Sequence, residues 1–70
     1  MTDHVYSITE IVGTSQTSIT DAIQNGIKTA AKTLRNLEWF EVVETRGHIA
    51  DGIVSHYQVT MRLGLRYESK

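Results

Sequence analysis

Residues 39–67, WFEVVETRGHIADGIVSHYQVTMRLGLRY, decide the fold. Near the middle of this stretch, Asp51-Gly52 is a strong signal for a two-residue hairpin turn, because both residue types tolerate the positive φ angles that such turns require. β-branched and aromatic residues are frequent on both sides of the turn, which favours strands. We therefore predict two antiparallel strands, from Trp39 to about Ile49 and from Ile53 to Tyr67.

The predicted turn fixes which residues face each other across the hairpin. Glu41 then faces Arg62, and this opposite-charge pair supports the register. Phe40 points inward with the other apolar residues, so alternation sends Trp39 to the opposite face, where it lies across from Gly64. An outward indole with no side chain opposite it suggests a stacking platform for a flat ligand.

The segment before the hairpin predicts one more strand. His4 to Val12 is rich in β-branched and aromatic residues, and the polar residues Gly13 to Thr17 follow it as a turn. Ile8 and Val12 fall on the same face of this strand as the charged Glu10, which indicates a bulge or contacts on both faces.

A helix of roughly 18 residues, from Ile19 toward Leu37, is expected between this strand and the hairpin. Ser18 is a suitable N-cap, and Asp21 three residues later resembles a capping box. The apolar residues that follow form one helical stripe: Ile19, Ala22, Ile23, Ile27, Ala30, Ala31, Leu34 and Leu37. Lys28, Lys32 and Arg35 form a separate stripe, which is either a solvated face or a phosphate-binding patch.

Together these elements predict an α+β fold in the order β-α-β-β, with a three-stranded antiparallel sheet and one helix packed on one face. The third strand is expected in the middle. Residues 1–70 form one domain, and a domain this short buries only about 60% of its unfolded surface. Chains of this size usually need further stabilisation from disulfides, a metal ion or partner subunits. The absence of cysteine excludes disulfides and leaves oligomerisation as the expected source. The two open edges of long strands also invite pairing.

Composition excludes several function classes. The three histidines, at positions 4, 48 and 56, have no spacing that suggests a metal site, and no metal is expected. The net charge of −1 gives no general attraction to nucleic acid or to a membrane surface. No apolar run approaches the ~20 residues of a membrane span, and no apolar segment typical of a signal peptide appears, so we expect a cytoplasmic protein.

No catalytic group is predicted. Ser55 and His56 are neighbours on a strand and should point to opposite faces, so they cannot act together. Gly13-Thr14-Ser15 lacks the further glycines of a dinucleotide-binding loop. We therefore expect a protein that is not an enzyme.

The outer face of the hairpin carries the candidate ligand-binding residues. Gln58, with an amide that donates and accepts, faces Thr45 in the predicted register, and it lies roughly 20 Å along the strand from Trp39. One flat ring could contact both only between subunits. Strict alternation places Glu44 and Arg46 on the core face, unless a bulge near Glu44-Thr45 reorients the strand. Alternatively, the far end of the strand extends past the helix, and both of its faces meet solvent.

Several motifs of the sequence resemble the dodecin family. They are Gly13-Thr14-Ser15 after Glu10-Ile11-Val12, Ala22-Ile23, Trp39-Phe40-Glu41-Val42, Arg46-Gly47 and Tyr57-Gln58-Val59. The match covers nearly the whole chain at matching spacing. Dodecins are small flavin-binding proteins that assemble into hollow dodecamers, in which pairs of flavins stack between symmetry-related tryptophans.

The resemblance implies a homo-dodecamer that stores FMN or riboflavin without turnover. It assigns flavin contacts to Trp39, Gln58, Arg46, Glu38 and Arg66. Some bacterial dodecins also bind coenzyme A, for which the plausible phosphate contacts are Lys28, Lys32, His4 and Tyr6. Two alternatives stay open, a coenzyme A or nucleotide-binding module and a purely structural assembly domain in which Trp39 is an interface residue.

Overall fold

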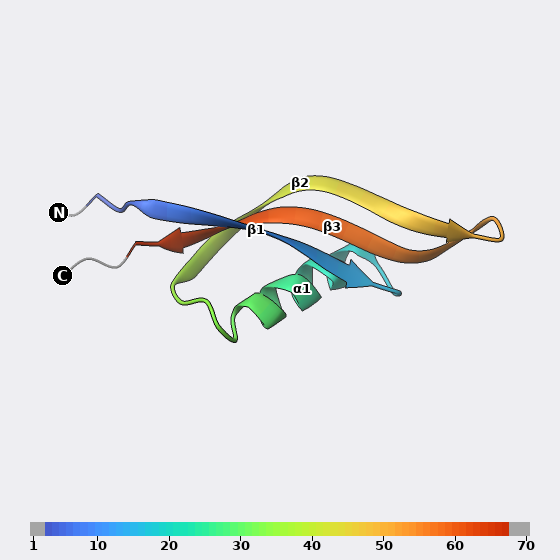
Figure 1. The fold of residues 1–70 in the computed structure, drawn as a ribbon, viewed down its shortest axis with the longest axis horizontal. Helices are drawn as coiled ribbons and strands as arrows, with labels where there is room; N and C mark the ends of the chain where they lie inside the picture. Colours follow the sequence, from blue (N-terminus) through green and yellow to red (C-terminus); the bar gives the residue numbers. More distant parts are fainter. Residues whose placement is uncertain (1–2, 68–70) are drawn as a thin grey trace.

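The computed structural model describes residues 3–67 and confirms the predicted fold class. The chain forms β1 (Tyr6–Ser15), α1 (Ile19–Ala30), β2 (Leu37–Ala50) and β3 (Ile53–Arg66) in that order. The strands make one antiparallel sheet in the order β1-β3-β2, so β3 lies in the middle as expected. Figure 1 shows α1 beneath the sheet and the β2–β3 hairpin reaching well past the helix.

The core is small and is centred on β3. Val59, Met61 and Leu63 of this strand and Ala22 of α1 are the fully buried apolar side chains among residues 3–67. A second set of partly buried side chains packs around them: Ile11, Ile23, Ile27, Ala30, Leu34, Leu37 and Leu65. Alternate residues of β3 supply this core because successive strand side chains point to opposite faces.

β1 is longer at its end than the sequence indicated. Residues Gly13 to Ser15 were expected to form a turn, but they continue the strand and pair with β3. A β-carbon on Gly13 would lie 2.1 Å from the carbonyl oxygen of Ala22, so glycine is needed here for close approach of the helix. The register along β1 is continuous, and Ile8, Glu10 and Val12 therefore share the face away from α1, with no bulge between them.

The helix begins where the sequence predicted. Ser18 Oγ accepts a hydrogen bond from the backbone N–H of Asp21 at 3.0 Å, as an N-cap residue does. The Asp21 carboxylate does not complete the capping box. It accepts instead from the hydroxyl of Ser15 at 2.7 Å. The Ser15 Oγ atom in turn accepts hydrogen bonds from the backbone N–H groups of Thr17 and Ser18. The half-buried polar cluster ties the end of β1 to the first turn of α1.

The predicted helix was too long, because α1 ends at Ala30 instead of continuing to Leu37. Beyond that residue the backbone tightens into three-residue turns, with the N–H of Thr33 donating to Ala30 O. Asn36 then takes a positive φ of 63°, which redirects the chain into β2. Leu34 and Leu37 still pack on the core, but from the connection. Lys32 and Arg35 thus lie outside the helix, and the predicted basic stripe does not exist.

The hairpin turn is the predicted one, with φ of 54° at Asp51 and 75° at Gly52. The predicted pairs of Trp39 with Gly64, Phe40 with Leu63 and Glu41 with Arg62 are all present. The register nevertheless shifts twice between these pairs and the turn.

The two shifts compensate each other. Val43 is an extra residue on β2, between the pairs Val42–Met61 and Glu44–Thr60. Ser55 is an extra residue on β3, between the pairs His48–His56 and Ile49–Val54. Residues 44–48 therefore pair with residues 56–60 one position away from the predicted register, which is regained on either side.

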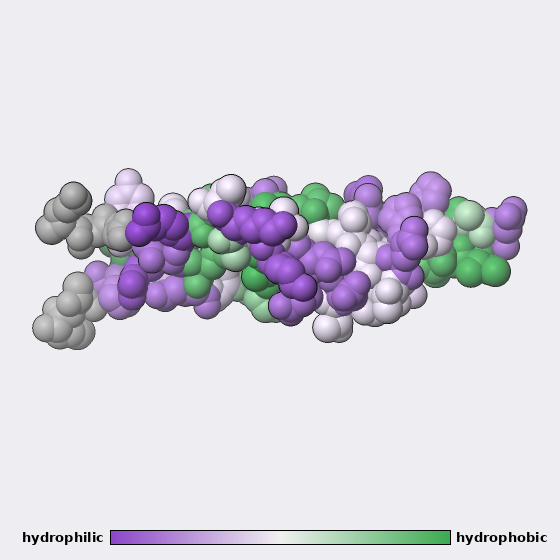
Figure 2. All heavy atoms as spheres, turned by 90° about the horizontal axis from the view of Figure 1, so that it is seen from below, coloured by the Kyte–Doolittle hydropathy of each residue, from purple (hydrophilic) through white to green (hydrophobic). Residues whose placement is uncertain are grey.

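Much apolar surface of the single chain is exposed. The helix packs on β1 and β3 and does not cover β2, so that Phe40 and Val42 on the helix side are 46% and 41% exposed. Ile49 and Ile53, beside the turn, are 71% and 70% exposed. Figure 2, seen from the helix side, shows hydrophobic surface at this hairpin end. No helix within residues 3–67 is long and apolar enough to cross a membrane.

Candidate functional site

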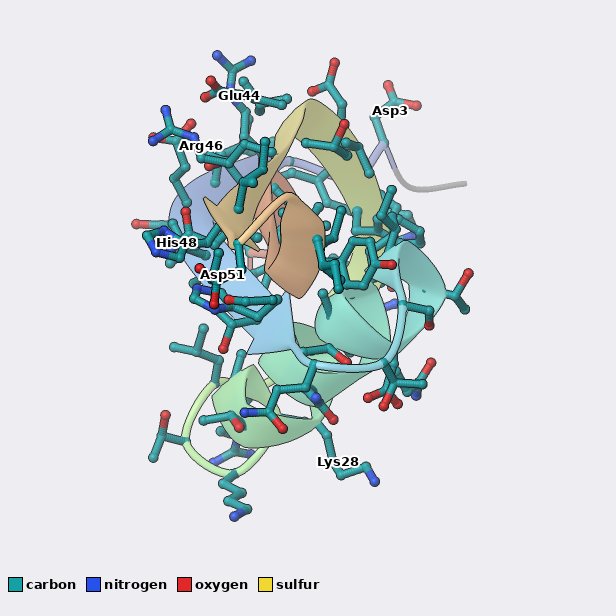
Figure 3. All side chains as sticks on the ribbon, turned by 90° about the vertical axis from the view of Figure 1, so that its right-hand side faces the viewer. Asp3, Lys28, Glu44, Arg46, His48 and Asp51 are labelled. Atoms are coloured by element: carbon teal, nitrogen blue, oxygen red, sulfur yellow. The ribbon has the colours of Figure 1, made fainter. Side chains whose placement is uncertain are left out.

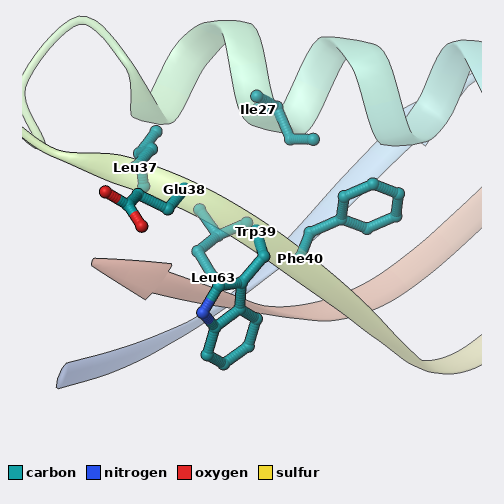
Figure 4. Close-up of a pocket in the computed structure, with 6 residues that line it drawn as sticks. All are labelled: Ile27, Leu37, Glu38, Trp39, Phe40 and Leu63. Atoms are coloured by element: carbon teal, nitrogen blue, oxygen red, sulfur yellow. The ribbon is translucent and has the colours of Figure 1, made fainter. Parts of the chain in front are cut away.

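We call the side of the sheet away from α1 the outer face. Trp39 lies at one end of it, as the hairpin register predicted. Its indole rests on Gly64, where an added β-carbon would lie 2.0 Å from Trp39 Cε2. Figure 4 shows Phe40 on the helix side of β2 and the indole on the other side. A flat indole that is 40% exposed is open to a stacking partner.

Three polar residues form a cluster beside this indole. Tyr6 packs against it with ring centroids 5.9 Å apart, and its hydroxyl donates to Glu38 Oε1 at 2.8 Å. The other carboxylate oxygen of Glu38 forms an ion pair with Arg66 Nη1 at 3.2 Å. The hydrogen bond to Glu38 is the main cause that raises the pKa of the Tyr6 phenol, and partial desolvation and the Glu38 charge add to it. Sequence reasoning named these residues but missed that they form one cluster.

A bulge explains how Glu38 comes to lie here. Leu37 pairs with Leu65 and Trp39 pairs with Gly64, so Glu38 is an extra residue of β2 at this point. The bulge lets Leu37 turn to the core while Trp39 keeps the outer face.

Arg46 and Gln58 form the second candidate cluster, near the other end of the outer face. The predicted pairing of Gln58 with Thr45 was wrong. Strict alternation put Arg46 on the core face, but the alternative of a bulge near Glu44-Thr45 is confirmed one residue earlier, at Val43. The bulge at Val43 puts Arg46 directly opposite Gln58 and turns Thr45 toward Val59 on the core side. Figure 3 shows Glu44, Arg46 and His48 together on the side of the hairpin away from α1. Arg46 also forms an ion pair with Glu44 at 3.1 Å.

A set of ion pairs across the three strands lies between the two clusters. Arg62 of β3 lies between Glu10 of β1 and Glu41 of β2, with N–O distances of 3.8 and 3.7 Å. Gln58 and Gly64 are six residues apart along β3, so the Trp39 indole and the Gln58 amide are roughly 20 Å apart in one chain. A ligand ring of ordinary size cannot touch both within one subunit.

The predicted coenzyme A contacts are divided between opposite sides of the sheet. His4 and Tyr6 contact each other through their rings, with centroids 6.4 Å apart, beside the Trp39 cluster. Lys28 lies in the last turn of α1, and Figure 3 shows its side chain extending away from the sheet. Lys32 lies on the turn that follows. One chain therefore does not gather these four residues into one phosphate site.

Ser55 and His56 do not diverge as the alternation predicted. Because Ser55 is the extra residue of a bulge, its Oγ lies 3.1 Å from His56 Nδ1. His56 in turn stacks on His48 across the hairpin. No group of three or more His, Cys, Asp or Glu side chains within residues 3–67 is arranged to hold a metal ion.

Comparison with known proteins agrees with this arrangement of elements and motifs. A family model described as Dodecin matches residues 5–68. This chain belongs to the dodecin family. The dodecin of Thermus thermophilus is 48% identical over 64 residues, which are 91% of this chain and 93% of that protein.

Two solved dodecins show how closely the fold is kept. Dodecin from Streptomyces coelicolor superposes with a TM-score of 0.92 at 47% identity, with all of both chains covered. Dodecin from Streptomyces davaonensis superposes with a TM-score of 0.91 at 51% identity, over 97% of this chain and 100% of that chain. Membership in the dodecin family confirms the resemblance found in the sequence and the β-α-β-β fold.

Proposed function

We propose that this protein binds flavins without catalysing a reaction, and that each isoalloxazine ring stacks on Trp39 at an interface between subunits of a homo-dodecamer. The observation that carries the proposal is the indole of Trp39, which lies flat on Gly64 with its other surface open. A large aromatic ligand gains most from such a surface because stacking needs a flat, unobstructed face. Membership in the dodecin family supports the same ligand class.

The second cluster supplies the polar contacts of the proposed site. The Gln58 amide can donate to and accept from the polar edge of an isoalloxazine, and Arg46 beside it offers charged donors. Since Gln58 and Trp39 of one chain are too far apart for one ring, the amide that meets the ring belongs to a neighbouring subunit. Binding and assembly are thus linked in this proposal.

The distribution of apolar residues supports the assembly. The core of the single chain is small, while Phe40, Val42, Ile49 and Ile53 are all exposed. Burying such side chains between subunits would contribute about 25 cal/mol for each Å² removed from water. Coenzyme A is the weaker ligand candidate, because His4 and Tyr6 lie across the sheet from Lys28 in one chain. Storage and sequestration of flavin are the proposed roles.

Flavin titration of the purified protein tests the proposal. Riboflavin and FMN share the isoalloxazine ring, so both should bind and lose fluorescence beside the indole. Light scattering after size-exclusion chromatography should give the mass of twelve chains. A stable monomer at micromolar concentration, or flavin fluorescence that the protein leaves unchanged, would contradict the proposal. An absorbance excess from a bound nucleotide without flavin colour would favour the coenzyme A alternative.

A further inference from the structure

The two histidines of the hairpin form a pair that the proposed flavin site does not use. His48 of β2 and His56 of β3 lie directly opposite each other, with ring centroids 5.2 Å apart and ring planes inclined by 11°. The pair exists because of the bulge at Ser55. Without this extra residue, His48 would lie opposite Ser55 and the imidazoles would not face each other.

The surroundings of His56 fix the orientation of its ring. Ser55 Oγ lies 3.1 Å from His56 Nδ1. In the tautomer with its proton on Nδ1, that nitrogen donates to the hydroxyl, and the lone pair of Nε2 is then available to a ligand. A hydrogen bond of this kind on the second nitrogen is the usual support of a metal-binding histidine.

A hollow of about 280 Å³ adjoins His56. It is lined by His56 together with Thr14, Ser15 and Gln16 from the end of β1 and the following turn. A volume of this size holds several water molecules, at about 30 Å³ each. Water in this hollow can therefore reach a metal ion bound at His56.

We propose that His48 and His56 together bind one divalent transition-metal ion per chain, with zinc as the probe of the site. Neutral imidazole is a preferred ligand of zinc, at Zn–N distances of about 2.0–2.1 Å, so the two nitrogens must come within about 4 Å of each other. His56 keeps its hydrogen bond to Ser55, and His48, which is exposed, has room to reach this separation by rotation of its side-chain torsions. Water completes the coordination.

Calorimetric titration of the assembled protein with zinc chloride at neutral pH tests the pair. The parent protein should bind one zinc ion per chain in a saturable step. His48→Gln and His56→Gln should each weaken this step by about tenfold or more, because even partners outside the ligand set typically contribute 10- to 100-fold to metal affinity. His4→Gln is the matched control, since it removes the third histidine, outside the pair, and should leave the step unchanged.

The titration distinguishes a shared site from two separate ones. If the histidines bind zinc independently, each single variant halves the number of ions bound and leaves the affinity of the rest unchanged, and the proposal is overturned. It is also overturned if the parent binds no more zinc than the double variant of His48→Gln and His56→Gln. The mass of the assembly, measured for every variant by light scattering, must match the parent for the comparison to count.

Discussion

The indole of Trp39 occupies the space in which a β-carbon of residue 64 would lie. An alanine at Gly64 would place that carbon 2.0 Å from Cε2 and 2.4 Å from Cδ2 of the ring. The whole ring must then move, because no contact between real atoms is that short. Gly64 is therefore part of the proposed platform although it offers no side chain to a ligand.

Gly64→Ala should displace the indole and weaken flavin binding. Overpacking of this kind typically costs about 1–3 kcal/mol of stability, and loss of a stacking surface costs about 1–3 kcal/mol of binding. Trp39 is the only tryptophan, so its fluorescence emission reports the displacement directly. Gly47→Ala is the control, since its added carbon would lie 3.3 Å from His56 O and away from the indole. Unchanged emission and unchanged flavin affinity in Gly64→Ala would show that the ring does not rest on this residue.

Gly13 and Gly26 should respond differently to alanine, although both lie between β1 and α1. A β-carbon on Gly13 would lie 2.1 Å from the backbone oxygen of Ala22, which cannot move without the helix. On Gly26 it would lie 3.0 Å from Cε of Met61, the end of a flexible side chain, and 3.3 Å from the backbone Cα of Gly13, which a shift of a few tenths of an ångström relieves. Alanine would also gain about 1 kcal/mol of helix propensity. We expect Gly13→Ala to lower the melting temperature strongly and Gly26→Ala to change it little. Equal losses in thermal denaturation would contradict this account of the close approach.

The Tyr6 phenol should titrate above its ordinary range. Its hydrogen bond to Glu38 raises the pKa in the folded protein, so the bond stabilises the fold up to about pH 10, the pKa of an unfolded tyrosine. That stabilisation is lost as the pH rises through the folded pKa. Absorbance of tyrosinate measures the titration, and Tyr6→Phe should remove the step at highest pH. Glu38→Gln should move that step down. If Tyr6→Phe removes an earlier step instead, the assignment is wrong.

The sequence predicted the parts of the fold that follow simple periodicity. Asp51-Gly52 defined the turn, and the opposite charges of Glu41 and Arg62 confirmed a register that the structure keeps at both ends of the hairpin. Alternation also placed Trp39 on the outer face. Alternation alone could not place Arg46, because an extra residue in a strand sends each following side chain to the opposite face of the sheet. A bulge near Glu44-Thr45 was the alternative that would reorient Arg46, and the structure has that bulge at Val43.

Other features depend on contacts that no local pattern contains. The apolar spacing of Leu34 and Leu37 continues the helical stripe, yet Asn36 in a positive φ ends any helix before β2. The His48–His56 pair requires the bulge on β3, and nothing around Ser55 in the sequence indicates it. The cluster of Tyr6, Glu38 and Arg66 joins three strands and becomes visible only in the folded sheet.

The stacking platform and the amide should contribute unequally to flavin binding. Trp39→Ala removes a stacking surface worth about 1–3 kcal/mol, by analogy with bases on aromatic side chains. Gln58→Ala removes a neutral hydrogen bond worth about 0.5–1.5 kcal/mol net. We therefore expect Trp39→Ala to weaken flavin binding more than Gln58→Ala, and Trp39→Phe to retain part of the affinity because it keeps a ring.

Quenching of flavin fluorescence measures all three variants, and the mass of the assembly is the control for each. If flavins stack in pairs between symmetry-related subunits, each lost indole also removes one wall of a shared cavity. The loss in Trp39→Ala should then exceed that of a single contact. Should Trp39→Ala bind and quench flavin as the parent does, the platform lies elsewhere on the molecule. Should Gln58→Ala be the weaker binder, hydrogen bonding to the ring edge dominates over stacking, and the proposed division of the site is wrong.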